Sequence, residues 1–362
     1  MLLRGDEKAD PRLVRSKEPL NLEMPFGELK EFLTPTRLHY VRNHYAIPEG
    51  KREGWRLTVQ GAGVSKRQEL SLAKLEAMKA TTLPVTLECA GNGRSFLLKK
   101  AKGVQWAHGA VGTAEWTGVP LADVLRLAGL KDSAVDIILD GADKGDPKKE
   151  GQPPAPVSFA RSIPVAKAAD VILAYAMNGK ELPRAHGFPV RAIVPGWYGC
   201  ASVKWLSRII VTTEPFPGFD QTLDYGYWKQ GDDGLPRLVP VTEMQPKASI
   251  AQPLGGAKLA KGEETRLFGA AWAGPSGVAK VEVSTDGGKT WQEAKLLDER
   301  KKWCWRRWEA RWTPRSAGAH ALQARATDGE GESQPKTHDE GRRSYMINFI
   351  QTTSVMVFDR KP

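Results

Sequence analysis

A lone cysteine at the end of a short apolar run constrains this sequence more than any other feature. Residues 84–87 are apolar or β-branched, which predicts a buried strand. Cys89 follows, and Gly91 and Gly93 on either side of an asparagine allow a tight turn with amides pointing inward. Cys89 could simply be a small buried residue beside an ordinary turn. It could also be a metal-binding thiolate, which Arg94 would favour.

The cysteine count limits the kind of metal site. The 362 residues contain three cysteines, Cys89, Cys200 and Cys304, so a disulfide framework is excluded. No second cysteine or histidine lies close to Cys89 in the sequence, which excludes the usual structural zinc site. A single thiolate can bind a metal when another molecule supplies most of the ligands. Cys89 as a ligand therefore implies an organic cofactor.

Length and charge narrow the choice of partners. At about 150 residues per domain, 362 residues predict two domains. The net charge of +11 would suit nucleic acid, anionic lipid or an anionic substrate. The sequence shows no nucleic-acid-binding signature and no apolar run close to the ~20 residues of a membrane span. We therefore expect a small dianionic substrate, no nucleic acid and no membrane span, and the charge would also suit an acidic electron acceptor.

Residues 87–94 read Leu-Glu-Cys-Ala-Gly-Asn-Gly-Arg and resemble the Cys-Ala-Gly-Asn-x-Arg signature of the sulfite oxidase family of molybdenum enzymes. Four further stretches resemble the same family: 41–44 (Val-Arg-Asn-His), 112–121, 174–191 and 194–206. The resemblance covers about residue 30 to the C-terminus. It implies an α+β fold, with a sulfite-oxidase-type molybdopterin-binding domain at 37–249 and an immunoglobulin-like β-sandwich dimerisation domain at 250–362. Residues 1–36 would form an arm over the main domain.

The resemblance also implies roles for individual residues. Cys89 would bind molybdenum, and the pyranopterin dithiolene called molybdopterin would supply two further sulfurs. The residues implied to face the substrate are Arg42, Arg94, Trp106, Tyr225 and Arg306. Those implied to hold the pterin are Asn43, His44, Asp143, His186, Arg191, Ser202, Val203 and Lys204. The residue types agree with this, because a phosphate favours bidentate arginine, a lysine charge and amides from a glycine-rich loop.

Several of these residues have an ordinary alternative. Residues 42–44 could be a solvated loop, and Trp106 could be a core aromatic. Asp143 after a strand often caps a turn, and a lone His186 would be a satisfied core histidine.

Three positions leave a choice open or depart from the family pattern. Tyr227 competes with Tyr225 for the place beside the metal. Arg306 is preferred to Arg307 because of the tryptophan spacing in residues 303–308. Gly93 stands where relatives commonly have a second arginine, which leaves the substrate affinity and the pocket charge open.

Local patterns predict the remaining elements. Helices are expected at 70–79, 121–128 and from 162 to about 175, and strands at 55–59, 135–139, 266–269, 278–283 and 319–326. Residues 144–156 read as an exposed loop, and Asn178-Gly179 as a hairpin turn. Residues 284–291 have the outline of an Asp-box, but a propeller would need repeats of it, so a hairpin is expected.

The resemblance implies oxidation of sulfite to sulfate, with two electrons leaving singly. The sequence carries no Cys-x-x-Cys-His motif and no segment like cytochrome b5, so a separate acceptor is expected, such as a c-type cytochrome. The alternatives are a sulfane dehydrogenase subunit, a nitrate reductase-like molybdoenzyme, and a non-catalytic cofactor-binding protein. Intact Cys89, His186, Arg191 and Lys204 argue against the last. A homodimer through the sandwich is implied.

The N-terminal residues have neither a signal-peptide apolar core nor a twin-arginine pair. We therefore expect a cytoplasmic protein, or a periplasmic one whose leader has been removed.

Overall fold

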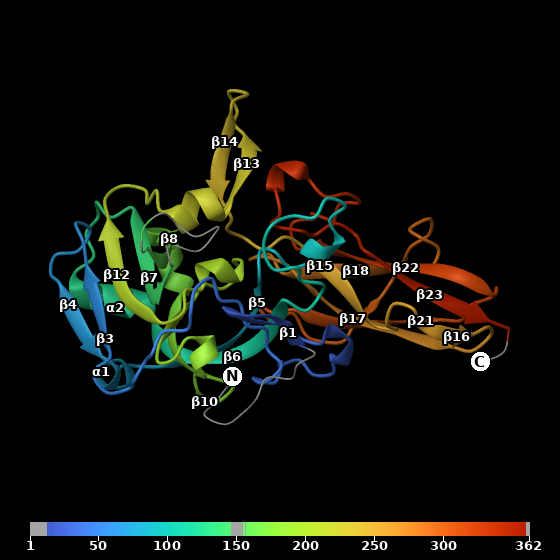
Figure 1. Ribbon diagram of the computed structural model, residues 1–362, viewed down its shortest axis with the longest axis horizontal. Coiled ribbons are helices and arrows are strands. Elements are labelled where there is room, and N and C mark those ends of the chain that lie inside the picture. Colours follow the sequence, from blue (N-terminus) through green and yellow to red (C-terminus); the bar gives the residue numbers. More distant parts are fainter. Residues whose placement is uncertain (1–12, 146–154, 156, 360–362) are drawn as a thin grey trace.

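Two β-rich domains lie beside each other along the long axis of the molecule (Figure 1). The computed structural model describes residues 13–145, 155 and 157–359. In that part of the chain the α-helices are α1 (Leu72–Glu76) and α2 (Leu121–Ala128). Sheets therefore supply most of the framework, and the helices cover one end of the first domain (Figure 1).

The first domain contains two five-stranded sheets. One has the order β10 (Lys180–Glu181), β9 (Ile172–Met177), β6 (Val111–Pro120) and β5 (Thr81–Glu88), with β11 (Arg191–Ile193) also paired to β9. The other has the order β4 (Gln68–Ser71), β3 (Arg56–Gln60), β12 (Leu206–Thr212), β7 (Asp136–Lys144) and β8 (Ser158–Pro164). The largest apolar cluster takes residues from both sheets and from α2, including Leu57, Val119, Val124, Leu139 and Leu206.

Helix α2 has the bounds predicted from the sequence, because its residues alone carry a helical pattern. Leu121, Val124, Leu125 and Ala128 are buried on one face, as helical spacing requires. Gly129 follows at φ 67°, a left-handed conformation that ends helices. The hairpin turn at Asn178-Gly179 is confirmed as well, because both residues have positive φ between β9 and β10.

The predicted helix from 162 to about 175 is wrong. This segment forms the end of β8, a 3-10 turn at Val165–Asp170, and then most of β9. Its apolar residues pair with β7 on one side and with β6 on the other, so distant partners override the local helical spacing. The helix expected at 70–79 is confirmed only at Leu72–Glu76, because Leu70 belongs to β4.

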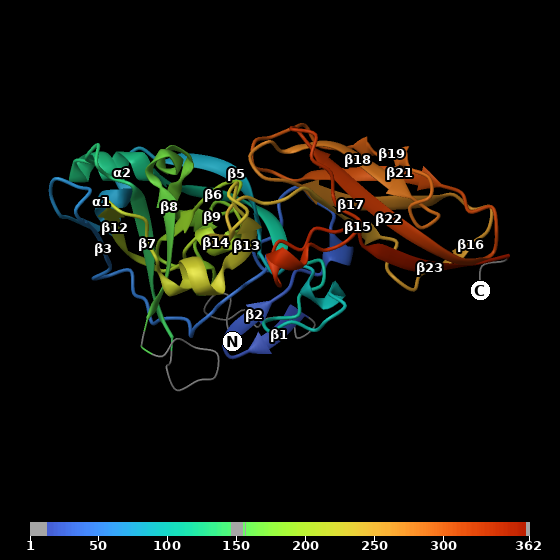
Figure 2. The ribbon, with the colours of Figure 1, turned by 90° about the horizontal axis from the view of Figure 1, so that it is seen from above.

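The second domain is the expected immunoglobulin-like sandwich (Figure 2). One sheet has the order β15 (Lys247–Gln252), β17 (Thr265–Trp272), β21 (Arg306–Trp312) and β20 (Lys295–Leu296). The other has the order β16 (Lys258–Ala260), β23 (Thr352–Phe358), β22 (Gly318–Asp328), β18 (Val278–Ser284) and β19 (Gln292–Glu293). Leu267, Val281, Trp308, Leu322 and Val355 fill the space between the sheets. The Asp-box-like turn joins β18 to β19, as a hairpin should.

The N-terminal segment contacts both domains. After the hairpin of β1 (Val14–Lys17) and β2 (Leu20–Leu22), the Met24 amide donates to Gly109 O of the first domain. From the second domain, Gln252 Nε2 donates to Gly27 O at 2.6 Å. The arm therefore bridges the two domains.

The predicted domain limits stay predictions. β15, the first strand of the sandwich, begins at Lys247, shortly before the expected limit at 249. Residues 1–12 and most of the loop expected at 144–156 lie outside the described residues. No helix in the described part of the chain is long and apolar enough to cross a membrane.

Candidate active site

Cys89 stands at the end of β5, where a network of hydrogen bonds holds the loop that follows. The Cys89 amide donates to Ala110 O, and the Asn92 amide donates to Cys89 O, both at 2.8 Å. The Asn92 side chain accepts from the Ala110 amide at 3.0 Å and donates to Glu88 Oε1 at 3.0 Å. The thiol is therefore carried on a fixed loop at a strand end, where functional residues concentrate.

Arg94 explains two of the glycines nearby. A Cβ at Gly91 would lie 2.3 Å from Arg94 Nη2, and one at Gly103 would lie 2.8 Å from Nη1. The guanidinium fits only because neither neighbour has a side chain. It donates to Val104 O at 2.8 Å and to Ser344 O at 3.1 Å. Arg94 thus links the cysteine loop to the second domain.

Gly93 faces the contact between the domains. Its φ is +95°, and a Cβ there would lie 3.1 Å from Gln351 Nε2, 3.2 Å from Ile347 Cγ2 and 3.4 Å from Lys247 Nζ. A side chain at this position would enter the domain interface. Its absence therefore affects how the domains fit together, and the effect of Gly93 on substrate affinity and pocket charge stays an open question of the sequence.

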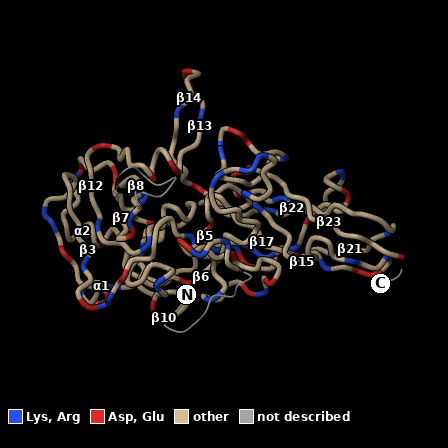
Figure 3. Tube along the Cα trace, viewed as in Figure 1, with Lys and Arg blue, Asp and Glu red and all other residues tan. Residues whose placement is uncertain are grey.

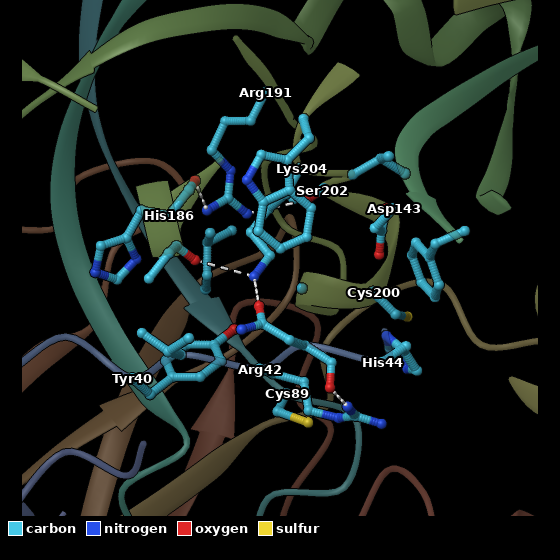
Figure 4. Close-up of a pocket in the computed structure, with 18 of the residues that line it drawn as sticks. Tyr40, Arg42, His44, Cys89, Asp143, His186, Arg191, Cys200, Ser202 and Lys204 are labelled. Carbon is cyan, nitrogen blue, oxygen red and sulfur yellow. Dashed lines mark hydrogen bonds between the residues drawn. The ribbon is translucent and has the colours of Figure 1, made fainter. Parts of the chain in front are cut away.

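Two cavities meet at the cysteine, and Arg42, His44, Cys89 and Tyr225 line both. The inner cavity lies inside the first domain (Figure 4). All eight residues implied to hold the pterin line it: Asn43, His44, Asp143, His186, Arg191, Ser202, Val203 and Lys204. The outer cavity, of about 610 Å³, contains Arg94, Lys102, Asp224 and three residues of the second domain, Arg343, Ser344 and Tyr345. The structure therefore brings together residues that are far apart in the sequence.

The inner cavity is lined by buried nitrogen atoms that lack a hydrogen-bond partner in the described residues. Arg191 donates from Nη1 to His186 O and from Nη2 to Ser202 O, both at 2.9 Å. Its Nε, and Nε2 of His186, are buried without a hydrogen-bond partner in the described residues. Unpaired buried polar groups are costly, so an anionic ligand that accepts from Arg191 Nε would remove its penalty, while the ring nitrogen of His186 can donate or accept according to its tautomer. This donor set fits a phosphorylated cofactor such as molybdopterin.

Lys204 and Asp143 lie in the same cavity, and burial shifts the pKa of each toward its neutral form. Lys204 Nζ donates to Ala185 O at 3.0 Å and to Asn43 Oδ1. Burial lowers the pKa of Lys204 well below its usual value, while burial raises the pKa of Asp143 to about 7 despite the lysine. Both shifts come from the loss of water, which disfavours the charged form of each group.

His44 and Tyr225 form a hydrogen-bonded pair at the junction of the cavities. Burial, followed by the Arg42 charge, lowers the pKa of His44 well below 6.5, so its imidazole is neutral. Burial raises the pKa of Tyr225 well above 10, so its hydroxyl stays protonated. Tyr227, the rival of Tyr225 in the sequence, lies on β13 (Gly226–Gln230) and lines neither cavity.

Arg306 does not reach the site, which corrects the sequence expectation. Its Nε donates to Asp298 O at 3.0 Å and its Nη1 to Val278 O at 3.3 Å, both within the sandwich. Arg307 pairs with Asp298 at 2.7 Å. Residues 303–305 precede β21 and are hydrogen-bonded to β5. The alternation of side chains that the tryptophan spacing suggested across residues 303–308 therefore does not apply to the whole run. The arginine that the second domain places at the outer cavity is Arg343.

Trp106 is also not where the resemblance places it. The side chain is fully buried among Val85, Leu87 and Cys89, and it lines neither cavity. The core-aromatic alternative therefore describes it better.

Several cavity residues were missed from the sequence. His39 and Tyr40 line the inner cavity directly before the Arg-Asn-His run, so the run could have been extended to include them. Cys200 lines it too, but burial raises the pKa of its thiol to about 11. No motif around Arg343 or Tyr345 in the sequence indicated that these residues line the outer cavity.

Comparison with known proteins shows the family of the chain. Residues 44–220 match the oxidoreductase molybdopterin binding domain, and residues 239–355 match the Mo-co oxidoreductase dimerisation domain. Sulfite oxidase of Gallus gallus is 38% identical over 352 residues, which cover 91% of this chain and 74% of that protein. The chain belongs to the sulfite oxidase family of molybdenum enzymes. Its cofactor is accordingly molybdenum held by molybdopterin.

Other members of the sulfite oxidase family resemble the chain over most of its length. Mitochondrial sulfite oxidase of Homo sapiens is 38% identical over 350 residues, covering 90% of this chain and 61% of that protein. The chain thus spans about three fifths of the length of the mammalian relatives it matches. The solved structure of the sulfane dehydrogenase SoxCD from Paracoccus pantotrophus superposes with a TM-score of 0.81 at 28% identity, covering 95% of this chain and 86% of that one.

Proposed function

We propose that this protein oxidises sulfite to sulfate and passes the electrons to an external acceptor. The meeting of the two cavities at Cys89 supports this most directly. The inner cavity offers buried donors to an anionic cofactor, and the outer cavity offers cationic side chains to a small anion. A single thiolate between them is a reasonable ligand for a soft redox metal.

Each cavity has its own task in this proposal. Cys89 would bind molybdenum, while His186, Arg191, Lys204 and the other lining residues of the inner cavity would hold molybdopterin. When bound, this cofactor supplies the two-electron redox change and the oxygen transfer. The protein positions the cofactor, binds the anion and manages protons.

Arg42 is the best candidate to bind the sulfite dianion. In the described part of the chain it donates only to Asn43 O, so most of its N–H groups remain available. Arg94 uses its donors on carbonyl groups, so it contributes charge and fixes the loop. Arg343 donates through Nη1 to Gly226 O at 2.9 Å and has further N–H groups at the outer cavity. Guanidinium groups at these positions would attract and orient the anion.

The His44–Tyr225 pair is placed to handle a proton. Oxidation of sulfite with one water yields sulfate, two protons and two electrons. A neutral imidazole can accept a proton, and the Tyr225 hydroxyl can relay one to His44 through their hydrogen bond. Because Arg42 lies nearby, a proton taken up by His44 would be passed on rather than kept.

Metal analysis and sulfite titration test the proposal together. We expect roughly one molybdenum per chain, as a site with one protein thiolate implies, and bleaching of the oxidised absorption spectrum when sulfite is added without an acceptor. Protein that holds the metal but is not reduced by sulfite would exclude this substrate. Protein without molybdenum after expression in a molybdopterin-producing host would exclude the mechanism.

A sulfane dehydrogenase activity is the second candidate. The similarity to SoxCD and an outer cavity larger than sulfite needs both favour it. Nitrate is a third substrate to test. Nitrate reductase [NADH] 1 of Oryza sativa subsp. japonica is 33% identical over 363 residues, which cover 90% of this chain and 39% of that protein. Reduction of the enzyme by a cysteine persulfide rather than by sulfite would favour the sulfane dehydrogenase activity. Reoxidation of the reduced enzyme by nitrate would favour a nitrate reductase activity.

A further inference from the structure

A groove of about 720 Å³ lies beside the outer cavity. One wall is the loop at residues 96–101, which continues directly from the cysteine loop, and the other is the segment 336–349 of the second domain. Arg343 lines both the groove and the outer cavity. The two segments lie between the sandwich and the hairpin that β13 forms with β14 (Pro236–Pro240) in Figure 1, and both carry basic residues (Figure 3). A molecule bound in the groove would sit next to the cavity that reaches Cys89.

The groove combines cationic and apolar side chains. Its cationic residues are Lys99, Lys100, Lys336 and Arg343, against one carboxylate, Glu340. Its apolar residues are Phe96, Leu97, Leu98 and Phe349. Leu98 is fully exposed, and together with the half-buried Phe96, Leu97 and Phe349 it forms an apolar patch beside charged residues, which is typical of an interaction surface. The three lysines form no ion pair in the described part of the chain, so their charge is free for a partner.

We propose that this groove docks the acidic face of the protein that accepts the electrons. The proposal rests on the proposed function, in which each sulfite oxidised releases two electrons that reduce two one-electron acceptors in turn. The lysines would attract the acidic partner, and the apolar residues would exclude water where its redox group approaches. A second copy of this chain that used the same groove fits poorly, because a two-fold contact would bring the cationic residues of the two grooves against each other. A flat lipid surface would not fill a groove.

Charge reversal at the groove tests the proposal. The variant is Lys99→Glu/Lys100→Glu/Lys336→Glu in the full-length holoenzyme, and the control is Lys66→Glu/Lys74→Glu/Lys79→Glu, which makes the same charge change around α1. The probe is a purified acidic c-type cytochrome with sulfite as substrate. At low ionic strength we expect the groove variant to reduce it about tenfold more slowly or worse, through a raised KM for the cytochrome. The control should stay close to wild type.

Salt and a second variant identify the nature of the contact. The difference should shrink above ~0.1 M salt, where the Debye length falls to ~10 Å. Leu98→Ser should slow cytochrome reduction at high salt as well as at low salt, because it removes an apolar contact. An unchanged rate for the triple variant, or for Leu98→Ser at every ionic strength, would overturn the proposal. So would a wild-type enzyme that reduces a basic c-type cytochrome better than the acidic one.

Failure of this proposal can be told apart from failure of the proposed function. Sulfite should reduce the triple variant as fast as wild type in stopped-flow experiments without an acceptor, because the lysines lie outside both cavities. If sulfite does not reduce wild type, the proposed function fails. If sulfite does reduce wild type, the proposed function stands and the docking proposal is tested by itself. The docking proposal fails if the triple variant leaves cytochrome reduction unchanged. A change in its self-association in sedimentation, or in its binding to anionic vesicles, would then assign the groove to a second copy or to a membrane.

Discussion

Lys247 of the second domain forms a buried ion pair with Glu88, the residue immediately before Cys89. Lys247 Nζ lies 3.1 Å from Glu88 Oε1, and both side chains are 2% exposed. The same ammonium group donates to Asn92 O at 2.9 Å. One ammonium group from the second domain therefore holds the cysteine loop on both sides of the thiol.

Lys247→Met should destabilise the protein, because Glu88 would be left buried without its partner. Breaking such a pair costs about 3–5 kcal/mol, which should appear as a large drop in Tm in thermal unfolding. Lys247→Met/Glu88→Gln removes both charges and should recover much of the loss. Equal losses for the single and double variants would show that the charge pairing is not the cause. The single variant should also retain less molybdenum.

Cys89→Ser should keep the fold and the pterin but lose sulfite oxidation with ferricyanide as acceptor, because the thiolate ligand is gone. Cys304→Ser is the matched control, since its Sγ donates to Pro84 O at the domain contact and a hydroxyl can do the same. Pterin fluorescence and ferricyanide reduction measure the two effects. Wild-type activity in Cys89→Ser would mean that Cys89 is not the ligand.

Arg343→Met should raise KM for sulfite, whereas Arg306→Met and Arg307→Met should leave it nearly unchanged. A charge-assisted hydrogen bond contributes roughly 1.5–3 kcal/mol, and each ~1.4 kcal/mol is tenfold in kcat/KM. The expected loss is therefore on the order of 10- to 100-fold. Because Arg343 also donates to Gly226 O beside Tyr225, kcat should fall too. Steady-state kinetics showing the opposite order would restore Arg306 to the site.

The Asp143 carboxyl should make the apoprotein less stable as the pH rises from about 4 to about 7, against the opposite contribution of the buried histidines, whose pKa values burial lowers. Burial raises the pKa of Asp143 from 3.8 to about 7, so the native state binds more protons than the unfolded state within that window, and stability is lost as pH rises. Asp143→Asn removes this contribution and should unfold at a higher temperature than wild type at pH 8, with little difference near pH 4. Burial also raises the pKa of Asp220 to about 7. Asp220 should therefore still contribute a loss of stability of the same sign, in the same pH window, in the Asp143→Asn variant. A pH-independent difference would contradict this assignment.

The protein should be a homodimer joined through the sandwich, because residues 239–355 match a dimerisation domain and a two-fold contact is the commonest oligomer form. Light scattering at micromolar concentration should give twice the mass of the chain. A monomer mass at that concentration would count against it.

Signals contained in a few neighbouring residues predicted their structures well. The spacing from Leu121 to Ala128 and the glycine after it specify α2 without help from elsewhere. Asn178-Gly179 specifies its hairpin turn for the same reason. The residues of the inner cavity were predicted through the family resemblance, because the eight residues implied to hold the pterin come from segments as distant as Asn43 and Lys204 and share no local pattern.

Signals that depend on distant partners were misread. Ile163 and Leu173 have a spacing compatible with a helix, yet pairing to β7 and β6 makes their segments strands. The chain contains many arginines, and only the packing of the second domain against the first places Arg343, and not Arg306, at the outer cavity. No pattern near either residue encodes that difference.

The segment at residues 303–305 joins the second domain to the strand that carries the cysteine. Trp303 O accepts from the Thr86 amide at 2.9 Å, and the Trp305 amide donates to Thr86 Oγ1 at 2.7 Å. Thr86 lies on β5, three residues before Cys89. Any hinge motion between the domains would pull on this strand and shift Cys89. A substitution of Thr86 that removes the hydrogen bond to its hydroxyl would therefore loosen the domain contact and the strand that carries Cys89 together.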